Sequence, residues 1–262
     1  MKKIAVITGG SSGVGFSFAK CLGNKAYTII ILARNENKIN QAIEQLTQQN
    51  IEAEGIICDV TSQTQIINAK KIIESKHQKI DFLILNAGIV TVKLLKDYSN
   101  TQELRNDIET DLWGVIQSAY YFESLLIEKS KVLIISSALG IFGIAGYSTY
   151  CAAKAGVINF AEAWRRELIS KKINVYVACP SDIDTQQYRN EIKSHPQWMK
   201  QKQTPRKPSS PDDVAKKIIK KCKGNLRFLI FPTTDVKFLY FINKILPRPL
   251  RDFLIDKIFP KP

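Results

Sequence analysis

Residues 8–15 read Thr8-Gly9-Gly10-Ser11-Ser12-Gly13-Val14-Gly15 and directly follow a short apolar run, Ile4-Ala5-Val6-Ile7. An apolar run of this length is typical of a strand buried in a parallel sheet. Residues 16–22 continue with helical character. Glycines between a strand and a helix allow a close backbone approach to a pyrophosphate, which accepts hydrogen bonds from free N–H groups at the helix start. The turn predicts a dinucleotide site; the alternative is a turn that only packs tightly.

Strand and helix patterns alternate along the rest of the chain. Further strands are predicted at residues 27–33, 51–58, 80–85, 131–136, 173–178 and 226–231. Helices are predicted at residues 36–49, 63–76, 101–128, 149–170 and 211–221. This alternation predicts one α/β domain over residues 1–232. Its doubly wound parallel sheet has about seven strands, helices on both faces and a ligand at the strands' carboxyl ends.

One stretch, residues 195–211, lacks periodicity and is rich in proline, lysine and glutamine. It predicts a mobile surface segment or the edge of a lid, and a plain solvated loop is the alternative.

Composition narrows the class of protein. The chain has 262 residues, of which 45% are hydrophobic, which is enough for one substantial core. Its five cysteines are scattered, which favours reduced thiols in the cytoplasm. With only two histidines, His77 and His195, we expect no metal site. No uncharged apolar segment of 18 residues occurs, so no spanning helix is expected.

The middle of the chain contains three candidate catalytic groups: the hydroxyl of Ser137, the phenol of Tyr150 and the ammonium group of Lys154. Ser137 follows the apolar residues 132–135, and Tyr150 and Lys154 share one helix face because they are four residues apart. A free phenol has a pKa of about 10, and a nearby cation lowers it. We therefore expect Tyr150 to donate a proton, Lys154 to lower its pKa and Ser137 to orient a carbonyl oxygen. Tyr147 is a competing phenol, without a lysine four residues on.

Together, the glycine turn, Ser137 and the Tyr150–Lys154 pair resemble the classical short-chain dehydrogenase/reductase family over nearly the whole chain. The resemblance implies a Rossmann-type fold, hydride transfer between NAD(P)(H) and a carbonyl or alcohol, and a homo-oligomer formed through the helices predicted at 101–128 and 149–170. It also makes Lys154 a ligand of the nicotinamide ribose. The cofactor contacts that it implies are Gly9, Ser11, Ser12, Gly13, Val14, Gly15, Asp59, Val60, Asn86, Ala87, Gly88, Tyr150, Lys154, Pro180, Ser181, Ile183 and Thr185. For Asp59, capping of the next helix is the alternative.

The end of the second predicted strand bears on the choice of cofactor. An acidic residue there would bind ribose hydroxyls and repel a 2′-phosphate, whereas this chain has Ala33-Arg34-Asn35. Arg34 can pair with a phosphate. NADP(H) is therefore the expected cofactor, and NAD(H) is the alternative. The alternative role for Arg34 itself is that of an arginine that only faces solvent.

The chain departs from the family at Asp111-Leu112-Trp113-Gly114, where the first residue is usually asparagine. In relatives that asparagine helps to hold a water in a proton relay. Asp111 is therefore a candidate catalytic residue that either keeps the main-chain contact and adds a negative charge near Lys154, or impairs turnover. Both outcomes stay open.

A second departure concerns the substrate. The run Pro180-Ser181-Asp182-Ile183-Asp184-Thr185 resembles 3-ketodihydrosphingosine reductases, which implies a long-chain lipid ketone as substrate. Asp182 or Asp184 could be the counter-ion of a cationic amino ketone. Alternatively, these aspartates cap the next helix or shape the cofactor loop.

Residues 233–262 combine a dense apolar surface with basic residues, among them Lys237, Lys244, Arg248 and Arg251. A basic, aromatic, amphipathic extension of this kind fits an anionic membrane surface. It also fits a lid over a lipid pocket, a subunit contact or terminal helices packed on the core.

The net charge of +14 raises nucleic-acid binding as an alternative. The lysines are spread over predicted helices and no nucleic-acid module is visible, so solvated helix faces and an anionic membrane are preferred. Two other functions stay open: a reductase of another ketone (3-oxoacyl, steroid-like or xenobiotic), and a non-catalytic nucleotide- or lipid-binding homologue.

Overall fold

The computed structural model describes residues 2–200, 207–224 and 228–259. Its centre is a seven-stranded parallel sheet in the order β3-β2-β1-β4-β5-β6-β7. The strands are β1 (Lys3–Thr8), β2 (Tyr27–Ala33), β3 (Ala53–Ile57), β4 (Ile80–Leu85), β5 (Leu126–Ile135), β6 (Asn174–Ala178) and β7 (Leu229–Ile230). The order reverses between β1 and β4, and ligands bind at the carboxyl ends of the strands at such a switch point. The predicted doubly wound fold is confirmed.

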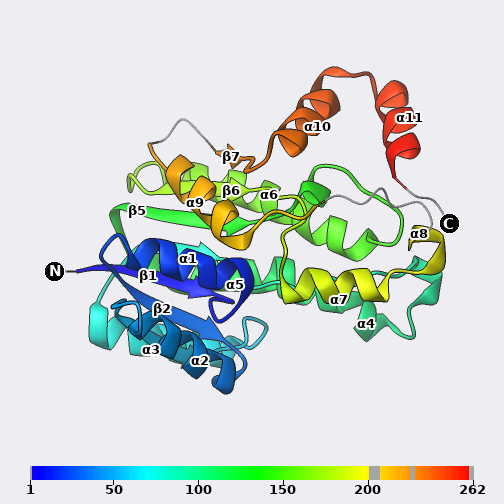
Figure 1. Ribbon diagram of the computed structural model, residues 1–262. Coiled ribbons are helices and arrows are strands. Elements are labelled where there is room, and N and C mark those ends of the chain that lie inside the picture. The colour runs from blue at the N-terminus through cyan, green and yellow to red at the C-terminus, as the bar shows by residue number, and fades with distance from the viewer. Residues whose placement is uncertain (1, 201–206, 225–227, 260–262) are drawn as a thin grey trace.

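Helices cover both faces of the sheet (Figure 1). One layer contains α1 (Gly13–Gly23), α2 (Glu36–Thr47) and α9 (Pro211–Lys221). The other contains α3 (Gln63–His77), α5 (Gly114–Phe122) and α6 (Ser148–Glu167). Successive residues of β1 alternate between the two cores, with Ala5 and Ile7 in the first and Ile4 and Val6 in the second. This explains why the strand reads as an unbroken apolar run.

The prediction of a single helix over residues 101–128 is wrong. The structure has α4 (Thr101–Asp107), a π-helical segment η2 (Ile108–Trp113), α5, and a 3₁₀ turn η3 (Glu123–Leu125). Residues 126–128 already belong to β5. Ser130 explains this early start, because its hydroxyl accepts from Ile127 N at 2.9 Å and donates to the Ile80 carbonyl of β4 at 2.7 Å.

Two helices lie where the sequence predicted none or only a surface segment. These are α7 (Gln186–Ser194) and α8 (Gln197–Lys200). His195, between them, is 4% exposed, so a solvated loop is wrong for this position. Residues 201–206 of that segment, and residues 226–227 of the last predicted strand, lie outside the described residues. Short 3₁₀ turns occur at η1 (Leu95–Asp97) and η4 (Ala138–Gly140).

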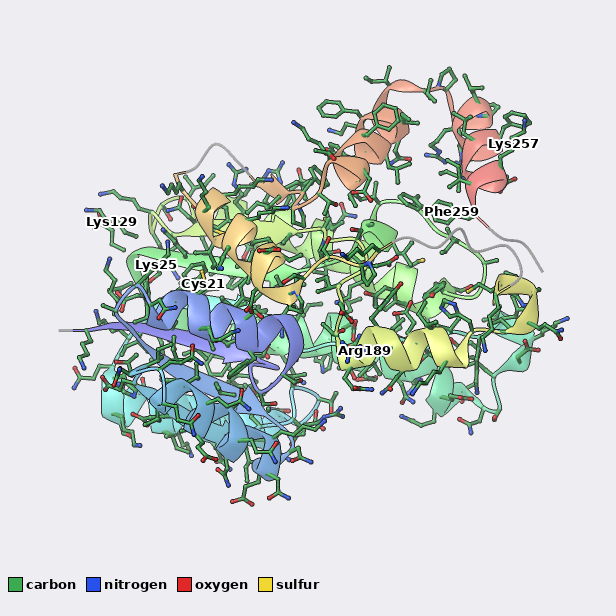
Figure 2. The ribbon with its side chains drawn as sticks, viewed as in Figure 1. Cys21, Lys25, Lys129, Arg189, Lys257 and Phe259 are labelled. Atoms are coloured by element: carbon green, nitrogen blue, oxygen red, sulfur yellow. The ribbon has the colours of Figure 1, made fainter. Side chains whose placement is uncertain are left out.

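The carboxyl-terminal helices α10 (Thr234–Ile245) and α11 (Arg248–Ile258) stand apart from the sheet layers, at the upper right of Figure 1. Phe259, labelled in Figure 2, returns to the body and packs on Phe142 with 5.3 Å between ring centroids. Across the described residues, no helix combines the length and the apolar character needed to traverse a bilayer.

Candidate active site

The turn between β1 and α1 requires glycine for steric reasons. Gly9 and Gly13 have φ angles of +66° and +56°, which favour glycine. A Cβ atom on Gly15 would lie 2.2 Å from the Gly9 carbonyl oxygen. Ser12 is the N-cap of α1 and makes no side-chain cap hydrogen bond, so the first-turn N–H groups stay available to an anion. This geometry fits a pyrophosphate.

A cavity of about 950 Å³ runs from this turn across the carboxyl ends of the strands. It brings together nearly all of the predicted cofactor and catalytic residues. Those that line it are Gly9, Ser11, Ser12, Gly13, Val14, Arg34, Asp59, Val60, Asn86, Ala87, Gly88, Asp111, Ser137, Tyr150, Lys154, Pro180, Ser181, Ile183 and Thr185. Gly15 does not line it, since it lies behind the turn and permits the close packing of Gly9.

Asn86 joins the ends of β1 and β4 at the cavity floor. Its side-chain amide donates to the carbonyl oxygens of Thr8 at 3.0 Å and Gly9 at 3.2 Å. The Thr8 hydroxyl in turn accepts from the backbone N–H groups of Asn86 and Ala87. Asn86 therefore holds the glycine turn in place as well as bordering the cavity.

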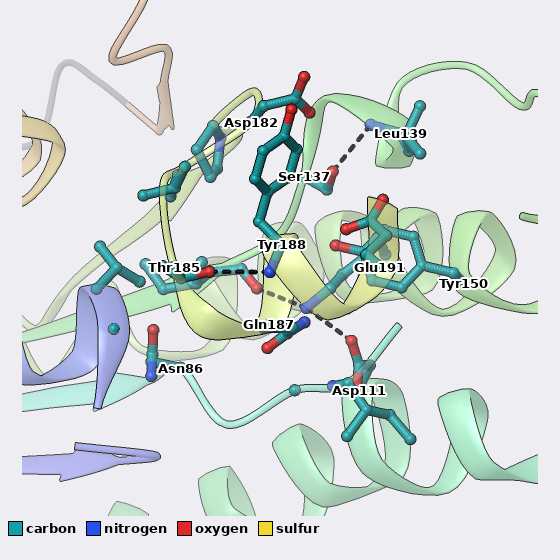
Figure 3. A pocket seen from close by; sticks show the side chains of 18 of the residues that line it. Asn86, Asp111, Ser137, Leu139, Tyr150, Asp182, Thr185, Gln187, Tyr188 and Glu191 are labelled. Carbon is teal, nitrogen blue, oxygen red and sulfur yellow. Dashed lines mark hydrogen bonds and ion pairs between the residues drawn. The ribbon is translucent and has the colours of Figure 1, made fainter. Parts of the chain in front are cut away.

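Ser137, Tyr150 and Lys154 all line the cavity, where Figure 3 shows Ser137 and Tyr150. Lys154 Nζ lies 5.6 Å from the centroid of the Tyr150 ring. Ser137 is the N-cap of η4, where its hydroxyl accepts from Leu139 N at 3.1 Å. The Ser136 hydroxyl donates to the Lys154 carbonyl at 2.8 Å, which ties the end of β5 to α6. The convergence thus depends on packing between a strand end and a helix far apart in sequence.

Asp111 forms a buried ion pair with Lys154. The Lys154 Nζ lies 3.0 Å from Asp111 Oδ2, and the two side chains are 5% and 0% exposed. Asp111 Oδ1 accepts from Ile89 N at 2.8 Å, and Lys154 Nζ also donates to the Ile135 carbonyl at 3.1 Å. The side chain of Asp111, carried by η2, therefore contacts the proposed catalytic lysine directly.

The pKa of the Tyr150 phenol lies above its ordinary value. Burial is the largest cause, and the negative charge of Asp111 is the second; interaction with the Ser137 hydroxyl offsets them in part. Lys154 is not among the leading influences on this pKa, and its ammonium lies 3.0 Å from the Asp111 carboxylate. Burial also raises the pKa of Asp111, and Lys154 counteracts that effect.

Arg34 and Asp59 line the cavity just after β2 and β3. Arg34 Nη1 lies 3.8 Å from Asp59 Oδ2, and the arginine side chain is 63% exposed. Asp59 Oδ1 also accepts from the backbone and hydroxyl of Thr61, while Ser62 is the N-cap of α3. Asp59 therefore shapes the turn before α3 without being its cap.

Helix α7 also lines the cavity and brings to it residues that the sequence did not single out as functional. Glu191 Oε1 accepts from the Tyr147 hydroxyl at 2.6 Å, and His195 Nε2 lies 2.9 Å from the same hydroxyl oxygen. Burial, followed by the charge of Glu191, raises the pKa of Tyr147. Thr185, which caps α7 by accepting from Tyr188 N, was the available signal for this helix.

The two aspartates of the run 180–185 have different surroundings. Asp182 lines the cavity, whereas Asp184 lies outside it and pairs with Arg189 at 2.9 Å. The suggestion that Asp184 binds a cationic substrate is therefore wrong, since an arginine already occupies it.

Comparisons with known proteins agree with this geometry. The family model described as short chain dehydrogenase matches residues 3–196. The 3-oxoacyl-[acyl-carrier-protein] reductase FabG of Escherichia coli (strain K12) is 32% identical over 189 residues, which cover 71% of this chain and 76% of FabG. The 11-beta-hydroxysteroid dehydrogenase-like 2 protein of Arabidopsis thaliana is 27% identical over 98% of this chain and 82% of its own length.

Among solved structures, actinorhodin polyketide ketoreductase with NADPH matches with a TM-score of 0.77, at 21% identity, covering 88% of this chain and 95% of that chain. A short-chain dehydrogenase/reductase from Burkholderia phymatum in complex with NAD has a TM-score of 0.78, at 18% identity, and covers 95% and 96% of the two chains. These two structures support the fold. The family model and FabG go further: the chain belongs to the short chain dehydrogenase family of NAD(P)-dependent oxidoreductases.

Proposed function

We propose that this protein reduces a ketone to a secondary alcohol, with NADPH as its cofactor. The observation that carries the proposal is the convergence of Ser137, Tyr150 and Lys154 on the cavity whose other end is the glycine turn. Bound NADPH would supply the hydride to the carbonyl carbon. The test is NADPH oxidation followed spectroscopically with a panel of ketones.

The roles of the residues follow from their positions. Ser137 and Tyr150 hydrogen-bond the substrate oxygen, and Tyr150 gives it the proton that completes the alcohol. The phenol is protonated at neutral pH, as a proton donor in the reductive direction must be. Lys154 binds the nicotinamide ribose, and its ammonium stabilises the negative charge that Tyr150 carries after it has given up its proton. Asp111 holds the Lys154 ammonium in position. Gly9, Ser11, Ser12, Gly13 and Val14 cradle the pyrophosphate.

Preference for NADPH is assigned to Arg34. Arg34→Leu is expected to raise the KM for NADPH about tenfold or more, since one charge-assisted hydrogen bond is worth roughly 1.5–3 kcal/mol. The KM for NADH should change little, because NADH lacks the 2′-phosphate. Arg166→Leu is the matched control, since this exposed arginine pairs with Glu162 on α6 outside the cavity. Equal changes in the two KM values would contradict the assignment.

The substrate is proposed to be a long-chain lipid ketone such as 3-ketodihydrosphingosine. The cavity lining supports this, because it includes the apolar side chains Leu139, Phe142, Ile144, Met199, Leu239 and Phe259. The names of the relatives favour a second candidate, another ketone such as a 3-oxoacyl thioester or a steroid. Comparing kcat/KM for these three ketones separates the candidates. Tight NADPH binding without turnover of any of them would identify a non-catalytic homologue.

Residues 233–262 are proposed to form an extension that rests on an anionic membrane surface, with the rest of the protein in the cytoplasm. The outward face of α10 carries Phe238, Phe241 and Ile245, exposed at 66%, 49% and 74%. Residues three and seven apart share a helix face, and Lys237 and Lys244 flank this one. Val236 and Leu239 of the same helix line the cavity, so the extension also borders the substrate entrance. A homo-oligomer is proposed from the resemblance alone.

The double substitution Phe238→Ser/Ile245→Ser is expected to reduce flotation with anionic phospholipid vesicles about tenfold or more, because burial of a large apolar side chain contributes roughly 1.5–3 kcal/mol. Leu95→Ser/Ile169→Ser is the matched control, since these side chains are 64% and 62% exposed outside the extension. An equal loss in both variants, or no loss in the first, would contradict the membrane proposal.

A further inference from the structure

Helix α7 and the residue that caps its end border the cavity. The lining includes the polar or charged side chains Tyr188, Arg189, Glu191, Lys193 and His195. Arg189 pairs with Asp184 at 2.9 Å, and Lys193 is exposed. Glu191 accepts from the Tyr147 hydroxyl, and the Tyr147 ring lies near the Tyr150 ring. Glu191 is therefore the acidic side chain that α7 contributes to the substrate side of the cavity.

Glu191 is fixed in this position by its neighbours. Its Oε1 accepts from the Tyr147 hydroxyl at 2.6 Å, and its side chain is 18% exposed. A phenol has a single proton, so His195 Nε2 at 2.9 Å acts as donor to the Tyr147 oxygen. The Nε2 atom of His195 is 3.9 Å from Glu191 Oε1, and the His195 side chain is 2% exposed. The carboxylate is therefore held before any ligand binds.

This carboxylate lies close to the reacting group. The Tyr147 ring, to which it is bonded, is 6.3 Å from the Tyr150 ring between centroids. Figure 3 shows Glu191 and Tyr150 in the same region of the cavity, and the charge of Glu191 contributes to the raised pKa of Tyr150. A ketone oxygen held by Tyr150 would leave the neighbouring atoms of its substrate within reach of Glu191.

Negative charge acts on the phenols at this side of the cavity. The charge of Glu191 contributes to the raised pKa of Tyr150, and the charges of Glu191 and Asp182 contribute to the raised pKa of Tyr147. Lys154 is balanced by Asp111 at 3.0 Å, and Arg189 by Asp184 at 2.9 Å. A partly buried carboxylate is stabilised most by a cation or a charged donor. Glu191 is thus suited to receive a positive group.

We propose that Glu191 is a specificity-determining residue that binds a protonated amine close to the carbonyl of the substrate. The proposal deepens the proposed function, on which it rests, and selects amino ketones among the apolar ketones that the cavity could admit. Tyr147 and His195 orient the carboxylate, and the apolar wall formed with α10 accepts the rest of the chain.

The test is Glu191→Gln, because the amide can still accept from Tyr147 but carries no charge. The substrates are a long-chain 2-amino-3-ketone and the ketone of the same chain without the amine. We expect the KM for the amino ketone to rise at least tenfold, with kcat nearly unchanged and the KM for the neutral ketone constant. Asp184→Asn, which removes a charge outside the cavity, should change neither KM. Equal changes for both ketones, or no change for the amino ketone, would overturn the proposal.

A binding measurement separates this inference from the proposed function. The thermal shift of the NADPH-loaded protein would be measured with two added ligands. These are the long-chain amino alcohol that corresponds to the amino ketone, and the same alcohol without the amine. Parent protein should bind the amino alcohol at least tenfold more tightly, and Glu191→Gln should remove the difference. If this holds while neither ketone is turned over, the reductase function fails and the cation site stands. Equal binding of the two alcohols would contradict amine binding by Glu191, even if the enzyme reduces both ketones.

Discussion

Tyr150→Phe is expected to lower kcat for ketone reduction by at least about a hundredfold, since a positioned general acid contributes roughly 10²- to 10⁴-fold. The substitution removes the proton that the product alcohol needs and leaves the aromatic ring in place. NADPH affinity should stay within about twofold, because the glycine turn, Arg34 and Lys154 are unchanged. Single-turnover kinetics and fluorescence titration of NADPH measure the two quantities separately.

Tyr147→Phe is the discriminating control, because it removes the other phenol on the same helix. The Tyr147 hydroxyl is already engaged by Glu191 and His195, so its loss should affect substrate KM more than kcat. A large fall in kcat for Tyr147→Phe, together with near-parent turnover for Tyr150→Phe, would reverse the assignment of the acid.

Much of the sheet could be predicted from the sequence because strands such as β1, β2 and β4 are buried on both faces. Tyr27–Ala33 and Ile80–Leu85 have the predicted bounds, and each is an apolar run followed by a polar or glycine-containing turn. The functional residues at the strand ends follow from this, since parallel strands end at one edge of the sheet. The tight turn at Gly9 and Gly13 was also predicted, and the positive φ angles of both glycines confirm it.

The segment from 101 to 128 could not be predicted, because its conformation depends on contacts across the fold. Asp107 is 1% exposed and accepts from Thr91 at 2.9 Å and Thr149 at 2.6 Å, and Asp111 pairs with Lys154. Buried carboxylates with such distant partners override a helical pattern and accompany the π-helical segment between them. Helical periodicity contains no information on these partners.

Helix α7 escaped prediction for a different reason. Its inward face carries Tyr188, Glu191 and His195 in place of an aliphatic stripe, because it borders a polar part of the cavity. One of these polar side chains, Glu191, is the residue proposed to bind the substrate amine. Its position in the cavity depends on the fold and not on a hydrophobic pattern in the sequence.

Lys154→Met is expected to destabilise the protein by roughly 3–5 kcal/mol, since removing one partner leaves the other charge buried without compensation. Asp111 is 0% exposed, and the pKa of its carboxyl is already raised by burial, with Lys154 as the largest opposing influence. Without the lysine, that carboxylate must take up a proton or draw water into the cavity floor. Equilibrium unfolding in urea, without cofactor, measures the loss.

The double variant Asp111→Asn/Lys154→Met separates stability from chemistry. Asparagine needs no counter-ion and can keep the hydrogen bond from Ile89 N, so most of the lost stability should return, to within about 1–2 kcal/mol of the parent. Turnover should stay at the level of Lys154→Met, because neither substitution restores the ammonium beside Tyr150. Additive losses in the double variant would mean that the 3.0 Å pair contributes no coupling energy. Recovery of turnover along with stability would mean that Lys154 serves only to neutralise Asp111, and its proposed place in the proton chemistry would be lost.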